Sequence, residues 1–250
     1  MNDLKSFCRM LSDESGKIIK QYFRTEINIE TKKDESPVTI ADKKSEEIMR
    51  ELIMKEFPEH GIIGEEFGKH NEHAEYKWIL DPIDGTKSFI TGALTFGTLI
   101  ALTKNNKPVL GVINQPILNE FLIGDNETAE LNGTKVKVRE CENISQATLL
   151  ASDHYMVGNF QNFEKFEQLA KQVKLYRNWG DCFGYYLLST GFADIMLDPI
   201  MNLWDLAALI PIVKGAGGEI TDWQGNDAAT GTSTIAANKK LHAAVVKLLN

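Results

Sequence analysis

Apolar residues recur at three- and four-residue intervals in two early segments of the chain. In the first, residues 3–24, the apolar positions are Leu4, Phe7, Cys8, Leu11, Ile18, Ile19, Tyr22 and Phe23. The second begins near Asp42 and runs to about Phe57, where Pro58 ends it, with Ile48, Leu52 and Ile53 on its inward side. This spacing matches the turn of an α-helix, so the pattern predicts two amphipathic helices.

Short apolar runs separated by turn residues follow these helices. Residues 60–66 predict a short strand that delivers acidic residues at its end, and Trp78-Ile79-Leu80 predicts a buried strand that ends in Asp81. The polar segment 68–77 between them predicts a mobile linker. Further along, a meander of strands is expected at 96–103, 108–115 and 119–124, with Asn132-Gly133 as a further hairpin turn.

After about residue 147 the pattern predicts alternating strands and helices. Strands are expected at 148–151, 173–177, 193–198, 218–222 and 233–237, and helices at 160–172, 181–191, 203–215 and 239–249. Such alternation is typical of α/β folds. The glycine-rich segment 215–218 predicts a helix end and a turn, because it lacks the spacing of a dinucleotide-binding loop.

The composition narrows the class of protein. The 250 residues are 43% apolar and 25% charged, which is ordinary for a globular enzyme, and the net charge of −8 argues against a nucleic-acid surface. The sequence shows neither a secretion signal nor an apolar run of about 20 residues. Its three cysteines are few and unpatterned. We therefore expect a cytoplasmic protein with no nucleic-acid or membrane partner.

The segment Asp81-Pro82-Ile83-Asp84-Gly85-Thr86 carries the strongest chemical signal. Pro82 is expected to stop the strand and turn the chain, which brings Asp84 back beside Asp81. Adjacent carboxylates repel each other unless protons or cations lie between them, and oxygen ligands suit Mg²⁺, Mn²⁺ or Ca²⁺. The free N–H groups that follow, where a helix could begin, suit a phosphate. The alternative is an Asp-Pro turn that binds nothing.

Three other carboxylates also stand at the end of an element or the start of a helix: Asp42, Glu65 and Asp205. Asp205 lies among apolar residues in the first turn of a predicted helix, where a buried carboxylate is costly unless it is paired or binds a metal. Its alternative role is to stabilise the helix dipole, which is worth under about 1 kcal/mol at exposed sites. Glu65 alone is a weak signal.

Five segments occur in an order and spacing that extend over nearly the whole chain: Val38-Thr39-Ile40-Ala41-Asp42, Gly64-Glu65-Glu66, Trp78 to Thr86, Trp204-Asp205-Leu206-Ala207-Ala208 and Gly215-Ala216-Gly217-Gly218. Together they resemble the inositol monophosphatase superfamily of Mg²⁺-dependent phosphatases. The resemblance implies an α/β (α+β) fold, a layered αβαβα sandwich. Its N-terminal α+β lobe would span residues 1–146 and carry most metal ligands, and its C-terminal α/β lobe would span 147–250.

The resemblance also implies a set of metal ligands. Glu65, Asp81 and the carbonyl of Ile83 would hold one metal ion, while Asp81, Asp84 and Asp205 would hold a second. The implied cofactor is Mg²⁺, with two or three ions per site, and Mn²⁺ could substitute. Four carboxylates bring about −4 of charge, which two such ions would cancel before a phosphate enters.

Catalytic and phosphate-binding roles follow from the same resemblance. The catalytic residues would be Asp42, Glu65 and Thr86, with Asp42 and Thr86 orienting the attacking water. The amides of Gly85 and Thr86 would bind the phosphate of a small phosphorylated substrate. Homodimers are common in such families, so a second copy of the chain is an expected partner.

Two segments of the second half bear on the substrate. Residues 177–185 and 193–199 look most like bacterial histidinol-phosphate phosphatases. Histidinol phosphate carries an ammonium group and an imidazole, so carboxylates in its pocket make chemical sense. Asp181 and Asp198 are therefore the expected substrate-binding residues, with Arg177 as a brace or phosphate-side partner. A helix N-cap is the alternative role of Asp181, and the two roles are compatible.

Two other functions stay open. One is an inositol-, sugar- or nucleotide-phosphate phosphatase of the same fold. The other is a binding partner of cellular machinery with weak residual hydrolysis. A complete acidic set argues against the second, because clustered carboxylates without a cation destabilise a fold.

Overall fold

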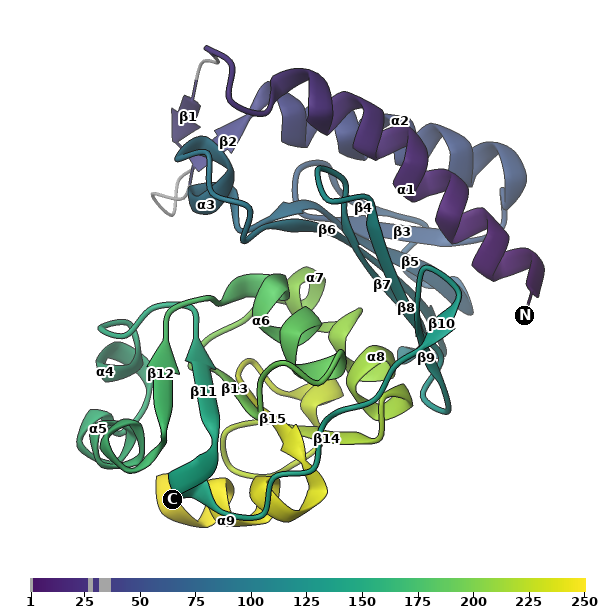
Figure 1. The fold of residues 1–250 in the computed structure, drawn as a ribbon. Helices are drawn as coiled ribbons and strands as arrows, with labels where there is room; N and C mark the ends of the chain where they lie inside the picture. The colour runs from purple at the N-terminus through teal and green to yellow at the C-terminus, as the bar shows by residue number, and fades with distance from the viewer. Residues whose placement is uncertain (1, 27–28, 32–36) are drawn as a thin grey trace.

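The computed structural model describes residues 2–26, 29–31 and 37–250. Figure 1 shows five layers: a pair of helices, a large sheet, a middle layer of helices, a smaller sheet and a last layer of helices. The layered αβαβα sandwich predicted from the sequence is therefore confirmed.

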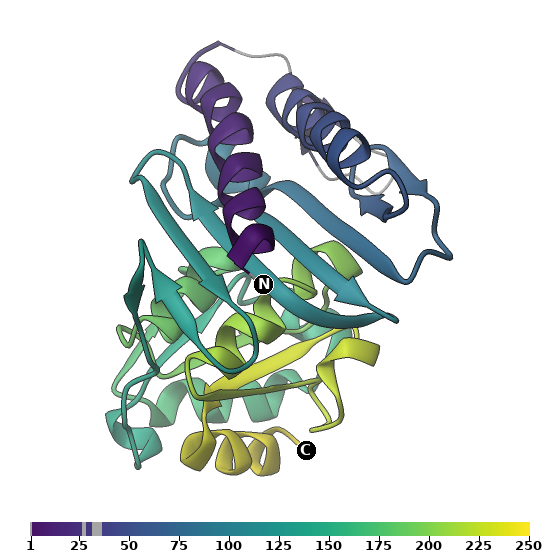
Figure 2. The same cartoon turned by 90° about the vertical axis from the view of Figure 1, so that its right-hand side faces the viewer.

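The first layer consists of the two helices predicted from the apolar periodicity, α1 (Asn2–Tyr22) and α2 (Ile40–Glu56). They lie side by side across the outer face of the large sheet (Figure 2). Buried Leu11 and Met49 belong to the core cluster that fills this interface together with Trp78. Thr39 caps α2, and the Asp42 carboxylate accepts a hydrogen bond from the Thr39 backbone N–H over 2.8 Å.

The second layer is an eight-stranded sheet of order β10-β9-β8-β7-β6-β5-β3-β4. All its neighbours are antiparallel except the parallel pair β3–β5. The strands from β6 onward confirm the predicted meander. The bounds are β3 Gly61–Gly64, β4 Gly68–His70, β5 Tyr76–Asp84, β6 Gly97–Lys104, β7 Lys107–Gln115, β8 Glu120–Gly124, β9 Ala129–Leu131 and β10 Thr134–Lys135. A separate two-stranded ladder joins β1 (Ile29–Thr31) to β2 (Pro37–Thr39).

Two predictions in this sheet are wrong. The expected linker 68–77 contains the edge strand β4 and the start of β5, because its polar residues pair through their backbones with β3 and β6. Pro82 also does not stop the strand. β5 continues to Asp84, and its register against β6 shifts between Asp81 and Asp84. A proline without an N–H donor is tolerated at such an irregularity, and Thr98 Oγ1 donates to the Pro82 carbonyl over 2.9 Å.

The fourth layer is a five-stranded mixed sheet of order β12-β11-β13-β15-β14. Its strands are β11 Thr148–Ala151, β12 Leu175–Arg177, β13 Ile195–Asp198, β14 Gly218–Thr221 and β15 Thr234–Asn238. The last layer is formed by α5 (Phe163–Gln172) and α9 (Lys239–Leu249), with the single turn α4 (Val157–Phe160) beside α5. The helix predicted at 160–172 is observed as α5, which begins at Phe163 instead of residue 160.

The middle layer contains α6 (Asp181–Ser189), α7 (Leu203–Leu206) and α8 (Leu209–Gly215). The single helix predicted over 203–215 is interrupted at Ala207 and Ala208, and α8 contacts β7 and β8 on one side and β14 on the other. Leu99 of the large sheet and Met196 of the small sheet belong to the same buried cluster around this layer. The division into lobes at residue 146 stays a prediction.

No helix among the described residues has both the length and the apolar character of a membrane-spanning segment.

Candidate active site

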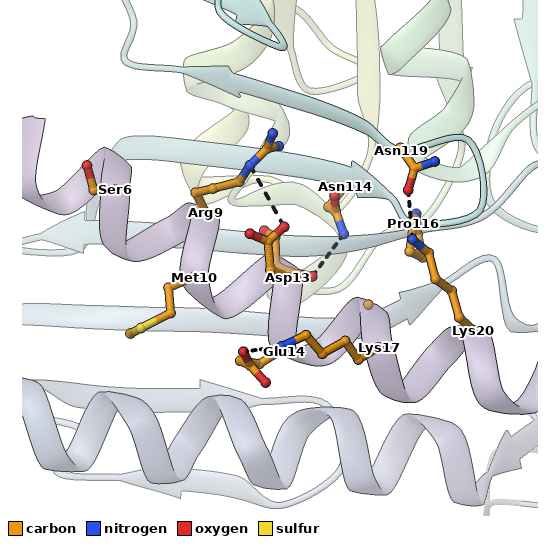
Figure 3. A pocket seen from close by; sticks show the side chains of 12 residues that line it. Ser6, Arg9, Met10, Asp13, Glu14, Lys17, Lys20, Asn114, Pro116 and Asn119 are labelled. Atoms are coloured by element: carbon orange, nitrogen blue, oxygen red, sulfur yellow. Dashed lines mark hydrogen bonds and ion pairs between the residues drawn. The ribbon is translucent and has the colours of Figure 1, made fainter.

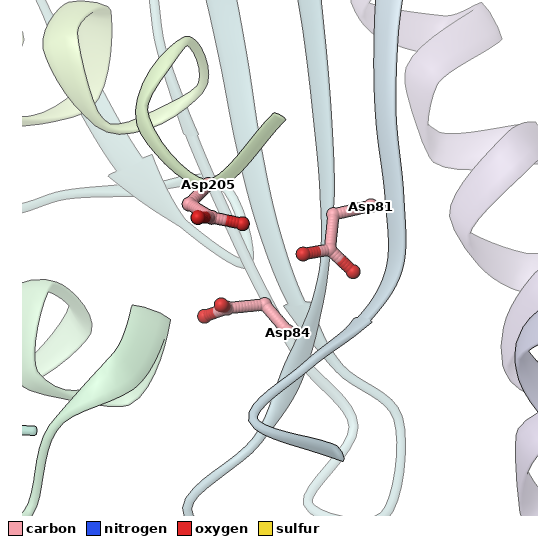
Figure 4. Close-up of side chains that lie close together, drawn as sticks. All are labelled: Asp81, Asp84 and Asp205. Carbon is pink, nitrogen blue, oxygen red and sulfur yellow. The ribbon is translucent and has the colours of Figure 1, made fainter. Parts of the chain in front are cut away.

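Three carboxylates from two layers converge between the large sheet and the middle helices. One oxygen from each of Asp81, Asp84 and Asp205 lies within 4.8 Å of the others, and Figure 4 shows the three side chains turned toward a common space. Asp81 and Asp84 come from the end of β5, and Asp205 comes from the first turn of α7, more than 100 residues later. The expected return of Asp84 to Asp81 is thus observed, through a strand irregularity instead of a strand end.

Local hydrogen bonds fix the backbone around this cluster. Asp81 Oδ1 accepts from the Ile83 N–H over 3.0 Å, which holds the irregular segment of β5 in a tight turn. Asp205 Oδ2 accepts from the Asn202 N–H over 2.7 Å as part of a capping box at the start of α7. The Cys182 N–H, in the first turn of α6, donates to the Asp84 carboxylate. Asp81 and Asp205 are therefore oriented by their own short stretches of chain, whereas Asp84 is oriented by α6.

Burial and the repulsion between like charges make it costly in free energy to ionise all three carboxyl groups of this cluster. Burial, followed by the nearby Glu65 and Asp84 carboxylates, raises the pKa of Asp81 well above its usual value. Burial also raises the pKa of Asp84, assisted by Asp181 and Asp205, and raises the pKa of Asp205 to about 6. A bound cation would relieve these penalties, and a set of oxygen-only ligands suits a hard divalent ion. The residues present therefore fit a metal centre.

A cavity of about 430 Å³ opens over this cluster and collects most of the predicted site residues. Its lining includes the expected metal ligands, the expected phosphate-binding residues and Asp181. They are Glu65, Asp81, Ile83, Asp84, Gly85, Thr86, Asp181 and Asp205. Asp42 is fully buried beside this cavity, and burial raises its pKa to about 6, with the Glu65 charge contributing. Its Oδ1 atom has no hydrogen-bond partner among the described residues.

In the turn after Asp84, the backbone of Gly85 lies close to two neighbouring segments of the chain. Gly85 precedes the short helix α3 (Thr86–Ile90) with φ = 85°, a left-handed conformation that favours glycine. A Cβ at this position would lie 2.9 Å from the Thr95 carbonyl oxygen and 3.0 Å from an Asp181 carboxylate oxygen. Thr86 Oγ1 donates to the Ile83 carbonyl over 3.0 Å, the same carbonyl that is expected to face a metal.

A second cavity of about 230 Å³ shares Asp84, Lys87, Asp181 and Asp205 with the first and extends toward the loops that follow β11, β12 and β13. Asp181 stands at its junction with the first cavity. It is the first residue of α6, with φ = 50°, and Gly180 instead of Asp181 occupies the N-cap position. The N-cap role is therefore not what the structure shows. Burial raises the pKa of Asp181 to about 6, while the nearby Lys87 ammonium lowers it.

The other two expected substrate residues occupy different settings. Asp198 lines the second cavity but is 5% exposed, and Tyr185 donates to its Oδ2 over 2.9 Å. Burial raises the pKa of Asp198 to about 8, which favours the neutral form of its carboxyl. Arg177 is exposed, donates to the Tyr176 carbonyl over 2.6 Å and lines neither of these two cavities.

Sequence reasoning missed several residues that line the site, among them Lys87, Asn202 and Asp153. Lys87 directly follows Thr86, so a cation adjacent to the expected phosphate-binding amides was available as a signal. Asn202 stands three residues before Asp205, which is the spacing of a capping box. Asp153 follows β11 at the carboxyl end of a strand, yet no local pattern distinguishes it from an ordinary loop residue.

A larger cavity of about 570 Å³ lies along α1, away from the carboxylate cluster (Figure 3). Its charged side chains are engaged with one another: Lys17 binds Glu14 over 2.7 Å, and Arg9 lies 3.8 Å from Asp13. Lys20 donates to the side chain of Asn119 over 2.7 Å. Volume alone does not identify a site, and this groove lacks the buried, charge-destabilised groups found between the sheets.

Comparison with known proteins agrees with this geometry. The model of the inositol monophosphatase family matches residues 3–250. A bifunctional chloroplastic phosphatase of Arabidopsis thaliana, IMPL2, is 46% identical over 219 residues, which cover 86% of this chain but 63% of that relative. A histidinol-phosphatase of Chlorobaculum parvum is 38% identical, covering 92% and 90% of the two chains. An inositol monophosphatase structure from Zymomonas mobilis superposes with a TM-score of 0.87 at 36% identity, covering 99% and 98%.

Proposed function

This chain belongs to the inositol monophosphatase family of phosphatases, and from that membership we propose that it is a Mg²⁺-dependent phosphomonoesterase that hydrolyses histidinol phosphate to histidinol and phosphate. The observation that carries the proposal is the cluster of Asp81, Asp84 and Asp205 at the junction of two acidic cavities. One cavity supplies the metal and phosphate site, and the other supplies a pocket for the alcohol.

The metal ligands are proposed to be Glu65, Asp81, the Ile83 carbonyl, Asp84 and Asp205. Divalent cations there would lower the pKa of bound water toward neutrality and stabilise negative charge on the phosphate and the leaving oxygen. The protein's own contribution is to hold these oxygens in place before substrate arrives. With cations bound there, the acidic cavity would accept a phosphate dianion instead of repelling it.

The phosphate is proposed to rest against the turn at Gly85 and Thr86, whose backbone N–H groups point out of the start of α3. Lys87 is exposed and lines both cavities, so its ammonium is placed to meet phosphate charge. Asp42 and Thr86 would orient the attacking water. Oδ1 of Asp42, which has no hydrogen-bond partner among the described residues, supports this role, because a buried carboxylate oxygen is favourable only when a further group binds it.

Substrate choice is proposed to depend on the acidic second cavity. Asp181 and Asp153 line it, and an ammonium or imidazolium group would gain charge-assisted hydrogen bonds there that a neutral sugar would not. We assign the cation contact to Asp181. Asp198, protonated behind it, would form a hydrogen-bonding wall of the same cavity. The similarity to proteins described as histidinol-phosphatases supports this choice.

Phosphate release from histidinol phosphate, inositol 1-phosphate and a nucleoside bisphosphate, measured side by side with Mg²⁺, tests the proposal. Histidinol phosphate should have the highest kcat/KM. Asp181→Ala should raise KM for histidinol phosphate at least tenfold more than for inositol 1-phosphate, since about 1.4 kcal/mol of charge-assisted contact is worth a factor of ten. Asp13→Ala, an exposed substitution on α1, serves as control. Equal rates on all three esters would remove the histidinol assignment.

A further inference from the structure

Side chains on one face of α2 bind the turn between β3 and β4, residues 64–68. It carries Glu65, whose own backbone N–H donates to the Leu80 carbonyl over 3.2 Å. On the other side of the turn, Glu46 and Arg50 stand one helical turn apart on α2 and form an ion pair over 2.7 Å. This pair lies outside the cavities described above, and the proposed chemistry does not use it directly.

Both members of the pair bind the backbone of the turn. Glu46 Oε2 accepts from the Glu66 N–H over 2.8 Å, and Glu46 Oε1 accepts from the Phe67 N–H over 3.2 Å. Arg50 donates from its Nε to Glu46 and from an Nη to the Gly68 carbonyl. Two side chains therefore bind backbone groups of the three residues that follow Glu65, namely Glu66, Phe67 and Gly68.

The contact is as close as the backbone permits. A Cβ placed on Gly64 would overlap the Glu46 carboxylate, so only glycine leaves room for that carboxylate against the chain. The Glu46 side chain is fully buried, and that of Arg50 is 12% exposed. Glu46 also lies one helical turn after Asp42, so α2 presents a line of polar groups along the underside of the site.

Fold stability alone does not explain this arrangement. Removing two charges from water offsets much of their attraction, and well-packed apolar residues usually stabilise a fold as well as a buried ion pair does. What apolar residues cannot do is bind N–H and carbonyl groups in fixed directions. Glu65 belongs to this turn and lines the same cavity as the carboxylate cluster. Its charge and its hydrogen bond help to raise the pKa of Asp81.

We propose that Glu46 and Arg50 are positioning residues that hold the Glu65 carboxylate in place for a divalent cation. The inference rests on the proposed function in that Glu65 must be a metal ligand. Outer partners that orient a ligand are commonly worth 10- to 100-fold in metal affinity. Loss of the ion pair therefore weakens cation binding through Glu65, while leaving the fold and the phosphate-binding turn in place.

The test measures the dissociation constant of Mn²⁺ from the signal of free Mn²⁺ in electron paramagnetic resonance, without substrate. Glu46→Gln and Arg50→Lys should each weaken Mn²⁺ binding about 10- to 100-fold. Glu47→Gln, the same chemical change at the next, exposed position of α2, should leave it unchanged. Circular dichroism in EDTA reports whether each variant is folded, and Arg50→Lys keeps the test available if Glu46→Gln does not fold.

A double-mutant cycle distinguishes positioning from general damage. In a Glu65→Gln background, adding Glu46→Gln should change Mn²⁺ affinity less than about twofold, because the ligand that Glu46 orients is already lost. An equal loss in both backgrounds would overturn the proposal, as would wild-type affinity in folded Glu46→Gln and Arg50→Lys. A wild-type protein that binds no Mn²⁺ would instead overturn the metal-dependent function itself, and this inference with it.

Discussion

Replacing Asp198 by Asn should stabilise the protein increasingly as the pH rises. In the folded protein burial raises the pKa of Asp198 to about 8, with the charges of Asp181 and Asp205 adding to the effect, whereas an unfolded aspartate titrates near 3.8. Between these values the folded state keeps a proton that the unfolded state has lost. The free energy of unfolding therefore falls as the pH rises through this interval, and it levels off above about 8.

The structure sets the size of this effect. One pKa unit corresponds to about 1.4 kcal/mol, so the contribution of this carboxyl between pH 5 and pH 8 is at most about 4 kcal/mol. Relaxation of the fold around a newly formed charge reduces that figure, and we expect about 2–4 kcal/mol. Asparagine has nearly the shape of a protonated aspartate, keeps an oxygen that accepts from Tyr185 and does not titrate.

Urea unfolding in EDTA at pH 5, 6, 7 and 8 measures the effect without metal linkage. The difference in unfolding free energy between Asp198→Asn and the wild type should grow in favour of the variant by about 2–4 kcal/mol across that range. Asp227→Asn, a change at an exposed N-cap, serves as the control. A difference for Asp198→Asn that stays flat with pH would show that this carboxyl is ionised when buried, and would refute the reasoning.

Two further substitutions test other parts of the structure. Arg139→Ala should lower the unfolding free energy by about 1.5–3 kcal/mol in urea titrations, because the fully buried Asp194 carboxylate loses a charge-assisted partner whose own side chain is 41% exposed; an unchanged unfolding free energy would contradict the pairing. Gly64→Ala should displace the Glu46 carboxylate and weaken Mn²⁺ binding at least about tenfold in the same resonance titration, and unchanged affinity would mean that this close contact does not hold Glu65.

Long, periodic elements could be predicted from the sequence because their own residues specify them. The apolar stripes of α1 and α2 and the alternating strands of the meander match the structure, since burial on one face selects a single period. The edge strand β4 could not be predicted in this way. Its residues are exposed and polar, and only backbone pairing with β3 makes it a strand.

The site likewise contains residues that the sequence alone could predict and one that required the fold. Asp81, Asp84, Gly85 and Thr86 are neighbours in sequence, so their proximity followed from one motif, whereas Asp205 joins them only through packing of α7 against β5. The protonation state of each carboxyl group could not be predicted from the sequence, because it depends on burial by distant segments.

Asp198 illustrates this limit. Its sequence context resembles that of a substrate-binding carboxylate, but the surrounding helices bury it beside Tyr185 and favour its neutral form. Asp181 illustrates another, since its left-handed backbone conformation is unusual for a residue other than glycine.

The most direct test of the account is anomalous diffraction from crystals of the active enzyme grown with Mn²⁺. The account predicts strong anomalous density within coordination distance of the carboxylates of Asp81, Asp84 and Asp205, with a neighbouring peak at Glu65 and the Ile83 carbonyl. Crystals of a protein that hydrolyses phosphate esters, but with no Mn²⁺ at these carboxylates, would contradict it.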